Sequence, residues 1–362
     1  MKVRLPVRKA ILQRTTYEAP AEGRLNKMRL DFNENTSGCG PAALLALRKL
    51  TPQQLAMYPE YAKPTRRIAA YFGIAEQELL LTNGGDDALR VFFDAFVEPS
   101  SHVLICEPTF PMYRYYAEIA GARVEALRYG SEMEFPLDDF IAALRRKPAV
   151  LFIANPNNPT GTVAVTEDLV RIARSAPDAA VLVDEAYFEF YGQSMLATRN
   201  ELSNLFVART FSKAYGLAGL RIGALVGDAE QMRAIRRVSS PYNVNAVALA
   251  CLPEALGDQA YIEQYVSEIR ESRGRLERTL EANGIRFWPS QANFVLARVG
   301  PAGSFVEQMV RRGVLIRDRS TDYGCDGCVR ITLGPRDHTG LLLTALQETC
   351  ETLGIAQGAS RR

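Results

Sequence analysis

Short apolar runs alternate with longer amphipathic segments over the first two thirds of the chain. Segments such as 137–147 and 166–176 have the period of helices with one apolar face. This alternation is typical of βαβ units around a mainly parallel sheet. A short glycine-rich segment joins the last two runs, so we expect the final strand to pair antiparallel. Seven runs predict strands, at 78–82, 102–106, 123–128, 149–154, 180–185, 205–210 and 222–227.

The pattern changes after about residue 245. A long charged helix is predicted over 258–284, followed by strand-like pieces at 293–299, 314–319 and 328–334. These segments predict a smaller α+β lobe, and residues 356–362 are expected to fray. The predicted division is an N-terminal arm with part of the small domain (1–40), a large domain that contains the seven predicted strands (41–245) and a C-terminal small domain (246–362).

Composition narrows the class of protein. The 362 residues are 47% hydrophobic and 23% charged, which is typical of a soluble globular protein. A formal net charge of +2 is smaller than the positive charge typical of nucleic-acid-binding proteins, so small-molecule partners are expected. No apolar run reaches the length of a signal-peptide core or a membrane span. Six cysteines without an export signal favour reduced thiols in a cytoplasmic protein.

Metal and hydrolase chemistry have little support in the sequence. Cys325 and Cys328 have the spacing of a redox or metal pair, but no second Cys or His pair lies nearby, so they are interpreted as structural. The two histidines, His102 and His338, are far apart, and zinc-protease motifs are absent. No metal site is predicted.

Candidate binding residues are expected just after the predicted strands, because ligands of open α/β sheets bind at the carboxyl ends of the strands. Gly84, Gly85 and Asp86 follow the first run and open a helix, an arrangement that suits a phosphate. An ordinary βα turn with an aspartate cap explains this stretch, taken alone, at least as well. The stretch "NPNNPTG" (155–161) predicts a rigid loop that sets the direction of Asn158.

Asp184 and Tyr187 lie at the end of another predicted strand. A carboxylate at an apolar strand end is costly without a positive partner, and a protonated ring nitrogen would be such a partner. A turn-capping aspartate and a core tyrosine are the alternative interpretation.

The stretch "TFSKAYGLAGLRIG" contains Ser212, Lys213 and Arg221. A lysine that burial deprives of its charge reacts with aldehydes as a Schiff base. Arginine and serine beside it are donors to a phosphate. A phosphate anchor, a Schiff-base lysine and an acid for a ring nitrogen together point to pyridoxal 5′-phosphate.

The same motifs, in this order, resemble the fold type I pyridoxal-phosphate aminotransferases, and specifically the histidinol-phosphate aminotransferases. Supporting stretches are "LDFNEN" (30–35), "EPTFPMY" (107–113), "ANF" (292–294) and "GCVRITLG" (327–334). The resemblance runs over nearly the whole chain. It implies an α/β fold, with a seven-stranded mainly parallel sheet in the large domain and a smaller α+β domain.

The resemblance also implies roles for individual residues. Lys213 would bond the cofactor aldehyde, Asp184 would pair with the pyridine nitrogen, and Tyr187 would hold the phenolic oxygen together with Asn158. Phe110 would stack on the ring. Tyr58 would reach the phosphate bound by a neighbouring subunit, which implies a homodimer with shared sites. The phosphate would lie among Gly84, Gly85, Asp86, Thr210, Ser212 and Arg221.

For the substrates, the resemblance assigns Arg330 to the carboxylate of the amino donor. Histidinol phosphate has no carboxylate, so we expect Arg330 to meet its phosphate instead, assisted by Arg317 and Arg319, with Asn158 also nearby. The implied reaction converts L-histidinol phosphate and 2-oxoglutarate into imidazole acetol phosphate and L-glutamate.

Four departures from the family pattern leave the substrate open: "NENT", "GGDD", Phe110 and "GPRD". None removes a group that the cofactor needs. The alternatives are an aromatic amino acid aminotransferase, a threonine-phosphate decarboxylase that uses the same cofactor, and, remotely, a non-catalytic binding module.

Overall fold

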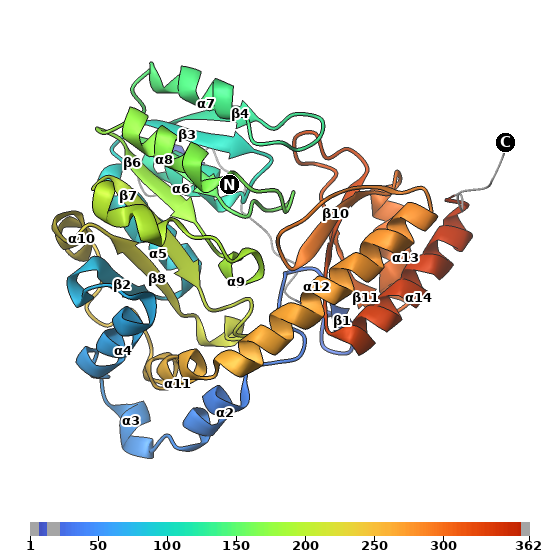
Figure 1. Ribbon diagram of the computed structural model, residues 1–362, viewed down its shortest axis with the longest axis horizontal. Helices are drawn as coiled ribbons and strands as arrows, with labels where there is room; N and C mark the ends of the chain where they lie inside the picture. Colours follow the sequence, from blue (N-terminus) through green and yellow to red (C-terminus); the bar gives the residue numbers. More distant parts are fainter. Residues whose placement is uncertain (1–6, 13–21, 356–362) are drawn as a thin grey trace.

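The computed structural model describes residues 7–12 and 22–355, which form two lobes (Figure 1). The expected fraying of 356–362, and most of the arm before residue 22, lie outside these residues. The larger lobe is built on a seven-stranded sheet. Its strand order is β2 (Leu79–Thr82), β8 (Gly223–Gly227), β7 (Leu205–Thr210), β6 (Ala180–Asp184), β5 (Val150–Ala154), β3 (His102–Glu107) and β4 (Arg123–Arg128).

The sheet has the predicted topology. Strands β4, β3, β5, β6 and β7 pair in parallel, whereas β8 pairs antiparallel with both β7 and β2. The expectation of a mainly parallel sheet with an antiparallel final strand is confirmed. The twelve residues that connect β7 to β8 contain no α-helix, whereas a parallel pair usually requires a helical crossover.

Helices cover both faces of this sheet, which explains why its strands are apolar on both sides. Side chains of α5 (Gly84–Phe96), α6 (Met112–Ala120) and α10 (Ala229–Arg236) pack into one core. The other core includes side chains of α4 (Ala62–Phe72), α7 (Leu137–Leu144) and α8 (Thr166–Ser175). The connecting segments include α9 (Phe188–Tyr191), η1 (Glu76–Glu78), η2 (Met195–Glu201) and η3 (Ala218–Leu220).

The smaller lobe is the predicted α+β unit. Its antiparallel sheet has the order β12 (Arg317–Asp318), β13 (Cys328–Thr332), β10 (Phe294–Arg298) and β9 (Arg286–Trp288). Strand β1 (Met28–Arg29) pairs in parallel with β11 (Val314–Leu315), so the N-terminal segment joins this lobe. The lobe's helices are α12 (Gln259–Ala282), α13 (Ala302–Arg311) and α14 (Arg336–Leu353).

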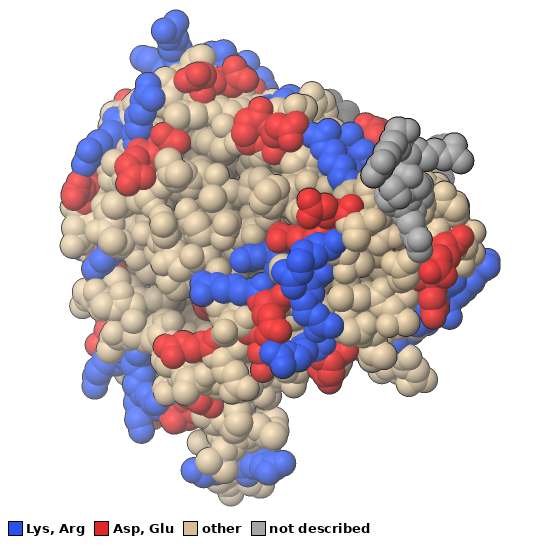
Figure 2. Space-filling view, turned by 45° about the vertical axis from the view of Figure 1, so that its right-hand side comes forward, with Lys and Arg blue, Asp and Glu red and all other residues tan. Residues whose placement is uncertain are grey.

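Three helices lie at the lower edge of the large lobe in Figure 1: α2 (Pro41–Arg48), α3 (Pro52–Ala56) and α11 (Ala246–Gly257). The short α1 (Lys9–Leu12) contacts α6. None of the helices in 7–12 and 22–355 combines the length and the apolar character needed to span a membrane. On the face shown in Figure 2, groups of Lys and Arg side chains lie next to groups of Asp and Glu side chains, and neither sign covers the face alone.

Candidate active site

A cavity of about 650 Å³ lies where the strand ends of the large lobe meet the small lobe. It brings together most of the residues that the sequence singled out. Gly84 adjoins it through Gly85, and Tyr58 lies outside it. The expected residues that line it are Gly85, Asp86, Phe110, Asn158, Asp184, Tyr187, Thr210, Ser212, Lys213, Arg221, Arg317, Arg319 and Arg330.

Lys213 reaches the cavity from the loop that follows β7. Its Nζ donates to the carbonyl oxygen of Phe32 at 2.9 Å. Burial lowers the pKa of Lys213 to about 8, and the positive charge of Arg330 acts in the same direction. A substantial fraction of the amine is therefore neutral near pH 8, as a nucleophile or proton acceptor requires.

Asp184 stands at the carboxyl end of β6. Its Oδ2 accepts a hydrogen bond from the Tyr113 hydroxyl at 2.8 Å, and its Oδ1 accepts from the Ala186 N–H at 3.0 Å. Burial raises the pKa of Asp184 to about 6, against the opposing effect of these two hydrogen bonds. A cationic partner in the cavity would restore the carboxylate to its charged form. The sequence motifs did not assign a role to Tyr113, although it ends the stretch "EPTFPMY".

An anion cradle forms at the start of α5. Gly84 has φ of 80°, and a Cβ there would lie 2.6 Å from Nη2 of Arg221. Arg221 pairs with Asp86 at 3.1 Å, while Thr210 donates to Ser212 at 3.0 Å. The N-cap residue is Asn83, which makes no side-chain cap hydrogen bond, so the suggested aspartate N-cap is absent. The Asp87 carboxylate instead accepts from the Asn83 N–H at 2.9 Å. The helix dipole and Arg221 both favour an anion here.

Asn158 and Tyr187 follow the neighbouring strands β5 and β6, and both line the cavity. The Tyr187 hydroxyl accepts a hydrogen bond from Asn33 Nδ2 at 2.7 Å. Oδ1 of Asn158 accepts from Arg330 Nη1 at 2.6 Å, and Arg330 Nη2 donates to the carbonyl of Asp31 at 2.5 Å. Arg330 is only 5% exposed, so its charge is held in place for an anion in the cavity.

The other two arginines on the small-lobe side have their own partners. Arg319 forms an ion pair with Asp322. The guanidinium of Arg317 lies 5.7 Å from the centre of the Phe32 ring, and that of Arg24 lies 4.2 Å from it. Phe32 is thus flanked by two cations at the cavity wall.

The two aromatic residues expected to serve the cofactor occupy different places. Phe110 lines the cavity, with its ring edge-on to Tyr113 at 5.8 Å. Tyr58 is 76% exposed and stacks on Tyr242 at 4.3 Å. It is not part of the site within its own chain.

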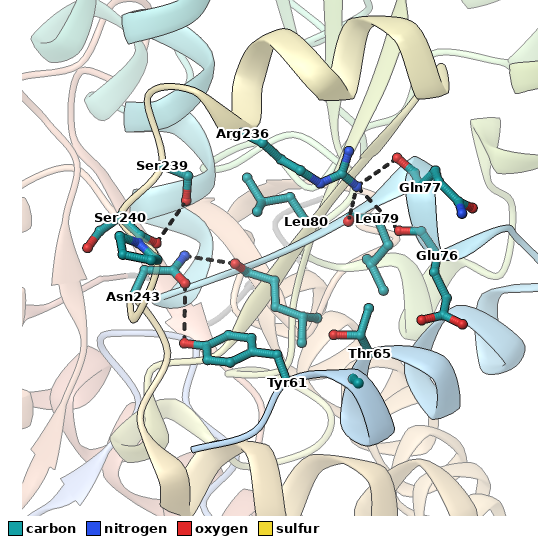
Figure 3. Close-up of a pocket in the computed structure, with 13 residues that line it drawn as sticks. Tyr61, Thr65, Glu76, Gln77, Leu79, Leu80, Arg236, Ser239, Ser240 and Asn243 are labelled. Carbon is teal, nitrogen blue, oxygen red and sulfur yellow. Dashed lines mark hydrogen bonds between the residues drawn. The ribbon is translucent and has the colours of Figure 1, made fainter. Parts of the chain in front are cut away.

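A second cavity, of about 590 Å³, is shown in Figure 3 and contains none of the expected site residues. Its polar groups are used to hold loops together. Nη2 of Arg236 donates to the carbonyls of Gln77 and Leu79 at 2.7 and 2.8 Å, and Asn243 donates to Leu81 at 2.8 Å. We assign it no chemistry. Within 7–12 and 22–355, no cluster of His, Cys, Asp or Glu side chains is suited to a metal ion.

The fold and the site define a class of enzyme: the chain belongs to the class I and II aminotransferases, whose family model matches residues 26–346. Within that class it belongs to the histidinol-phosphate aminotransferase family. It is 37% identical to the histidinol-phosphate aminotransferase of Caldanaerobacter subterraneus over 80% of this chain and 83% of that one. It is 35% identical to that of Geobacillus sp. WCH70 over 90% and 91%.

A solved structure supports the same assignment. The histidinol-phosphate aminotransferase from Sinorhizobium meliloti, determined in complex with pyridoxal 5′-phosphate, superimposes with a TM-score of 0.86. The two sequences are 26% identical, and the match covers 95% of this chain and 97% of that chain. The chain is therefore a pyridoxal-phosphate-dependent aminotransferase, as its sequence predicted. Its residues also fit that cofactor, since the cavity contains an anion cradle, a lysine of lowered pKa and a buried carboxylate.

Proposed function

We propose that this enzyme transfers an amino group between L-glutamate and imidazole acetol phosphate, giving L-histidinol phosphate and 2-oxoglutarate. The observation that carries the proposal is that Lys213 and Arg330 line the same cavity. The relatives of this chain are histidinol-phosphate aminotransferases. Both substrates carry an anionic group, and Arg330 lines the cavity with only 5% of its surface exposed.

The residues that would hold the cofactor follow from the site. The amides of Gly84, Gly85 and Asp86 would bind its phosphate, with Thr210, Ser212 and Arg221 as further donors. Asp184 would pair with the pyridine nitrogen, and Tyr187 and Asn158 would bind the phenolic oxygen. Phe110 would cover one face of the ring.

The chemistry divides between the cofactor and the chain. When bound, pyridoxal phosphate supplies a ring that accepts the electron pair left when the substrate's Cα–H bond breaks. Lys213 would remove that proton with its neutral amine and would later deliver a proton to the carbon that was the cofactor's aldehyde carbon. The Asp184 carboxylate would keep a proton on the ring nitrogen, because the buried carboxylate and the protonated nitrogen would stabilise each other's charge.

Arg330 would serve two unlike substrates in turn. The carboxylate of glutamate and the phosphate of histidinol phosphate are both oxyanions, and a guanidinium forms paired hydrogen bonds with either. Either anion would compete for the Arg330 donors with their present acceptors, Asn158 and Asp31. Arg317 and Arg319 would add positive charge at the same wall.

We further propose a homodimer with shared sites in the cytoplasm. The segment 44–58 exposes a run of large apolar side chains that a second copy would cover. Tyr58, 76% exposed and outside its own cavity, is available to a neighbour's site. Six unpaired thiols fit a reducing compartment. The exposed apolar residues are Leu44, Leu45, Leu47, Leu55 and Met57.

The proposal is tested by steady-state assays of the purified, cofactor-loaded enzyme. L-Histidinol phosphate with 2-oxoglutarate should give glutamate with a higher kcat/KM than L-phenylalanine does. L-Threonine phosphate should release no carbon dioxide. Lys213→Ala should abolish the reaction. A preference for phenylalanine, or release of carbon dioxide from threonine phosphate, would contradict the proposed substrate and leave the family assignment unchanged.

A further inference from the structure

Three consecutive residues of the N-terminal segment contact three groups of the active site. The segment lies between β1 and α2 and passes between the two lobes (Figure 1). The Asp31 carbonyl accepts from Arg330, and the Phe32 carbonyl accepts from Lys213. The third contact is the hydrogen bond from Asn33 Nδ2 to Tyr187, at 2.7 Å. The strand and loop motifs assigned no role to Asn33.

The direction of the Asn33–Tyr187 hydrogen bond is fixed by Thr332. The backbone N–H of Asn33 donates to Thr332 Oγ1 at 3.1 Å, and Thr332 Oγ1 donates its proton to Asn33 Oδ1 at 2.9 Å. The amide oxygen of Asn33 therefore faces Thr332, and its NH₂ group faces Tyr187. Asn33 must donate, and the Tyr187 oxygen must accept.

The local fold holds this arrangement firmly. Asn33 is 1% exposed, and Thr332 is fully buried on β13. Asn33 has φ of 56°, in the left-handed region that asparagine tolerates better than most residues. Its carbonyl also accepts from Asn293 Nδ2 at 3.1 Å. Hydrogen bonds on both sides of the residue therefore maintain a conformation with an intrinsic cost.

We propose that Asn33 is a positioning residue that directs the hydroxyl proton of Tyr187 into the cavity, toward the phenolic oxygen of the bound cofactor. Because Tyr187 accepts from Asn33, its own proton is available to another acceptor. Within residues 7–12 and 22–355, its only hydrogen bond is the one that it accepts. Accepting one hydrogen bond also strengthens the one that a hydroxyl donates. The inference rests on the proposed contact of Tyr187 with the cofactor.

The test replaces Asn33 by aspartate, which keeps the shape but removes the NH₂ donor. A carboxylate accepts only, so Tyr187 would donate to it and turn its proton away from the cofactor. A hydrogen-bond donor on the phenolic oxygen withdraws electron density and so lowers the pKa of the bound chromophore. The pH midpoint of the cofactor's visible absorption band should therefore rise, by about one pH unit, after Asn33→Asp.

A double-mutant cycle separates this hydrogen bond from the added negative charge. Absorption titrations without substrate are made on the wild type, Asn33→Asp, Tyr187→Phe and the double variant. The shift caused by Asn33→Asp should be smaller when Tyr187 is already phenylalanine. Equal shifts in the two backgrounds would overturn the proposal. Asn283→Asp, at a position that is 4% exposed and outside the cavity lining, is the control and should leave the midpoint unchanged.

The outcomes also distinguish this inference from the proposed function. If Tyr187→Phe alone leaves the midpoint unchanged, the contact between Tyr187 and the cofactor is wrong, and the proposal for Asn33 is overturned with it. If Tyr187→Phe shifts the midpoint but Asn33→Asp does not, the positioning role alone is wrong. Because no substrate is present, neither result depends on which amino donor the enzyme prefers.

Discussion

At the scale of single residues, burial prepares the site by moving two pKa values toward neutrality. It lowers the pKa of Lys213 to about 8 and raises that of Asp184 to about 6. Each group is thereby closer to its uncharged form than in water, and each gains from a partner that the cofactor would supply.

The lowered pKa of Lys213 predicts how cofactor loading depends on pH. Only the neutral amine attacks an aldehyde, so the rate of loading should rise with pH up to about 8 and then level off. A lysine with the ordinary value of 10.5 would give a rate that continues to rise well beyond this point. Growth of the visible band after mixing stripped protein with pyridoxal phosphate measures this rate. A loading rate that levels off only near pH 10 would contradict the lowered pKa of Lys213. Lys213→Ala, which lacks the amine, is the negative control.

Arg330 gives a second prediction at this scale. Arg330→Ala should raise KM for both glutamate and histidinol phosphate, by an amount equivalent to about 2–4 kcal/mol, because a buried charge pair is lost in each complex. Arg336→Ala, which removes a 73% exposed arginine of the same lobe, should change neither KM. An effect on only one substrate would show that Arg330 does not serve both.

At the scale of elements, β6 ends in Asp184 and β7 leads to Lys213, the two residues to which we assign the proposed chemistry, and a buried ion pair links these strand ends. Arg209 and Glu185 lie 2.8 Å apart with side chains that are 4% and 1% exposed. They are the chain neighbours of Thr210 and Asp184. The pair thus fixes the spacing between the strand that leads to Lys213 and the strand that ends in Asp184.

The start of α5 is the element most sensitive to substitution. Gly84→Ala would place a Cβ 2.6 Å from Arg221 Nη2 and would force alanine to adopt φ of 80°. We expect a loss of about 1–2 kcal/mol of stability and a larger Kd for pyridoxal phosphate. Thermal unfolding and cofactor titration measure the two effects. Gly303→Ala, in α13 with no atom within 4 Å of the added Cβ, should leave Kd unchanged. A wild-type unfolding temperature and a wild-type Kd for Gly84→Ala would contradict the assignment of the phosphate site to the start of α5.

The elements also show what a single sequence can predict. Apolar runs located the ends of all seven strands of the large sheet to within one residue, and residues that follow several of those strands line the cavity. Asn33 was not assigned a role, because its partner Tyr187 is 154 positions away and no local pattern pairs them. Tyr113 was missed because it lies on the buried face of α6, where a tyrosine is indistinguishable from a core residue until Asp184 is placed beside it.

At the scale of the whole molecule, the two lobes are joined by the N-terminal segment as well as by α12. Strand β1 pairs with β11 of the small lobe, whereas α2 contacts α11 of the large lobe edge. The residues between them form one wall of the cavity. The apolar segment 44–58 projects from the same edge and is the surface that the proposed dimer would bury.

The dimer is tested by placing charge on that surface. Leu45→Glu combined with Leu55→Glu, at positions 53% and 60% exposed, should convert a dimer to a monomer at micromolar concentration. Sedimentation velocity measures the change. Val165→Glu, at a 48% exposed position on the same lobe, should leave the dimer intact. A wild-type monomer, or a dimer unaffected by the double variant, would contradict the assignment of this surface.

The most direct test of the substrate is the half-reaction with a single amino donor. Cofactor-loaded enzyme is mixed with L-histidinol phosphate alone, and its absorption spectrum is followed, with L-phenylalanine and L-threonine phosphate in parallel. We predict that histidinol phosphate converts the visible band stoichiometrically to that of pyridoxamine phosphate, much faster than the other two donors do. An unchanged band with histidinol phosphate, together with conversion by phenylalanine, would contradict it.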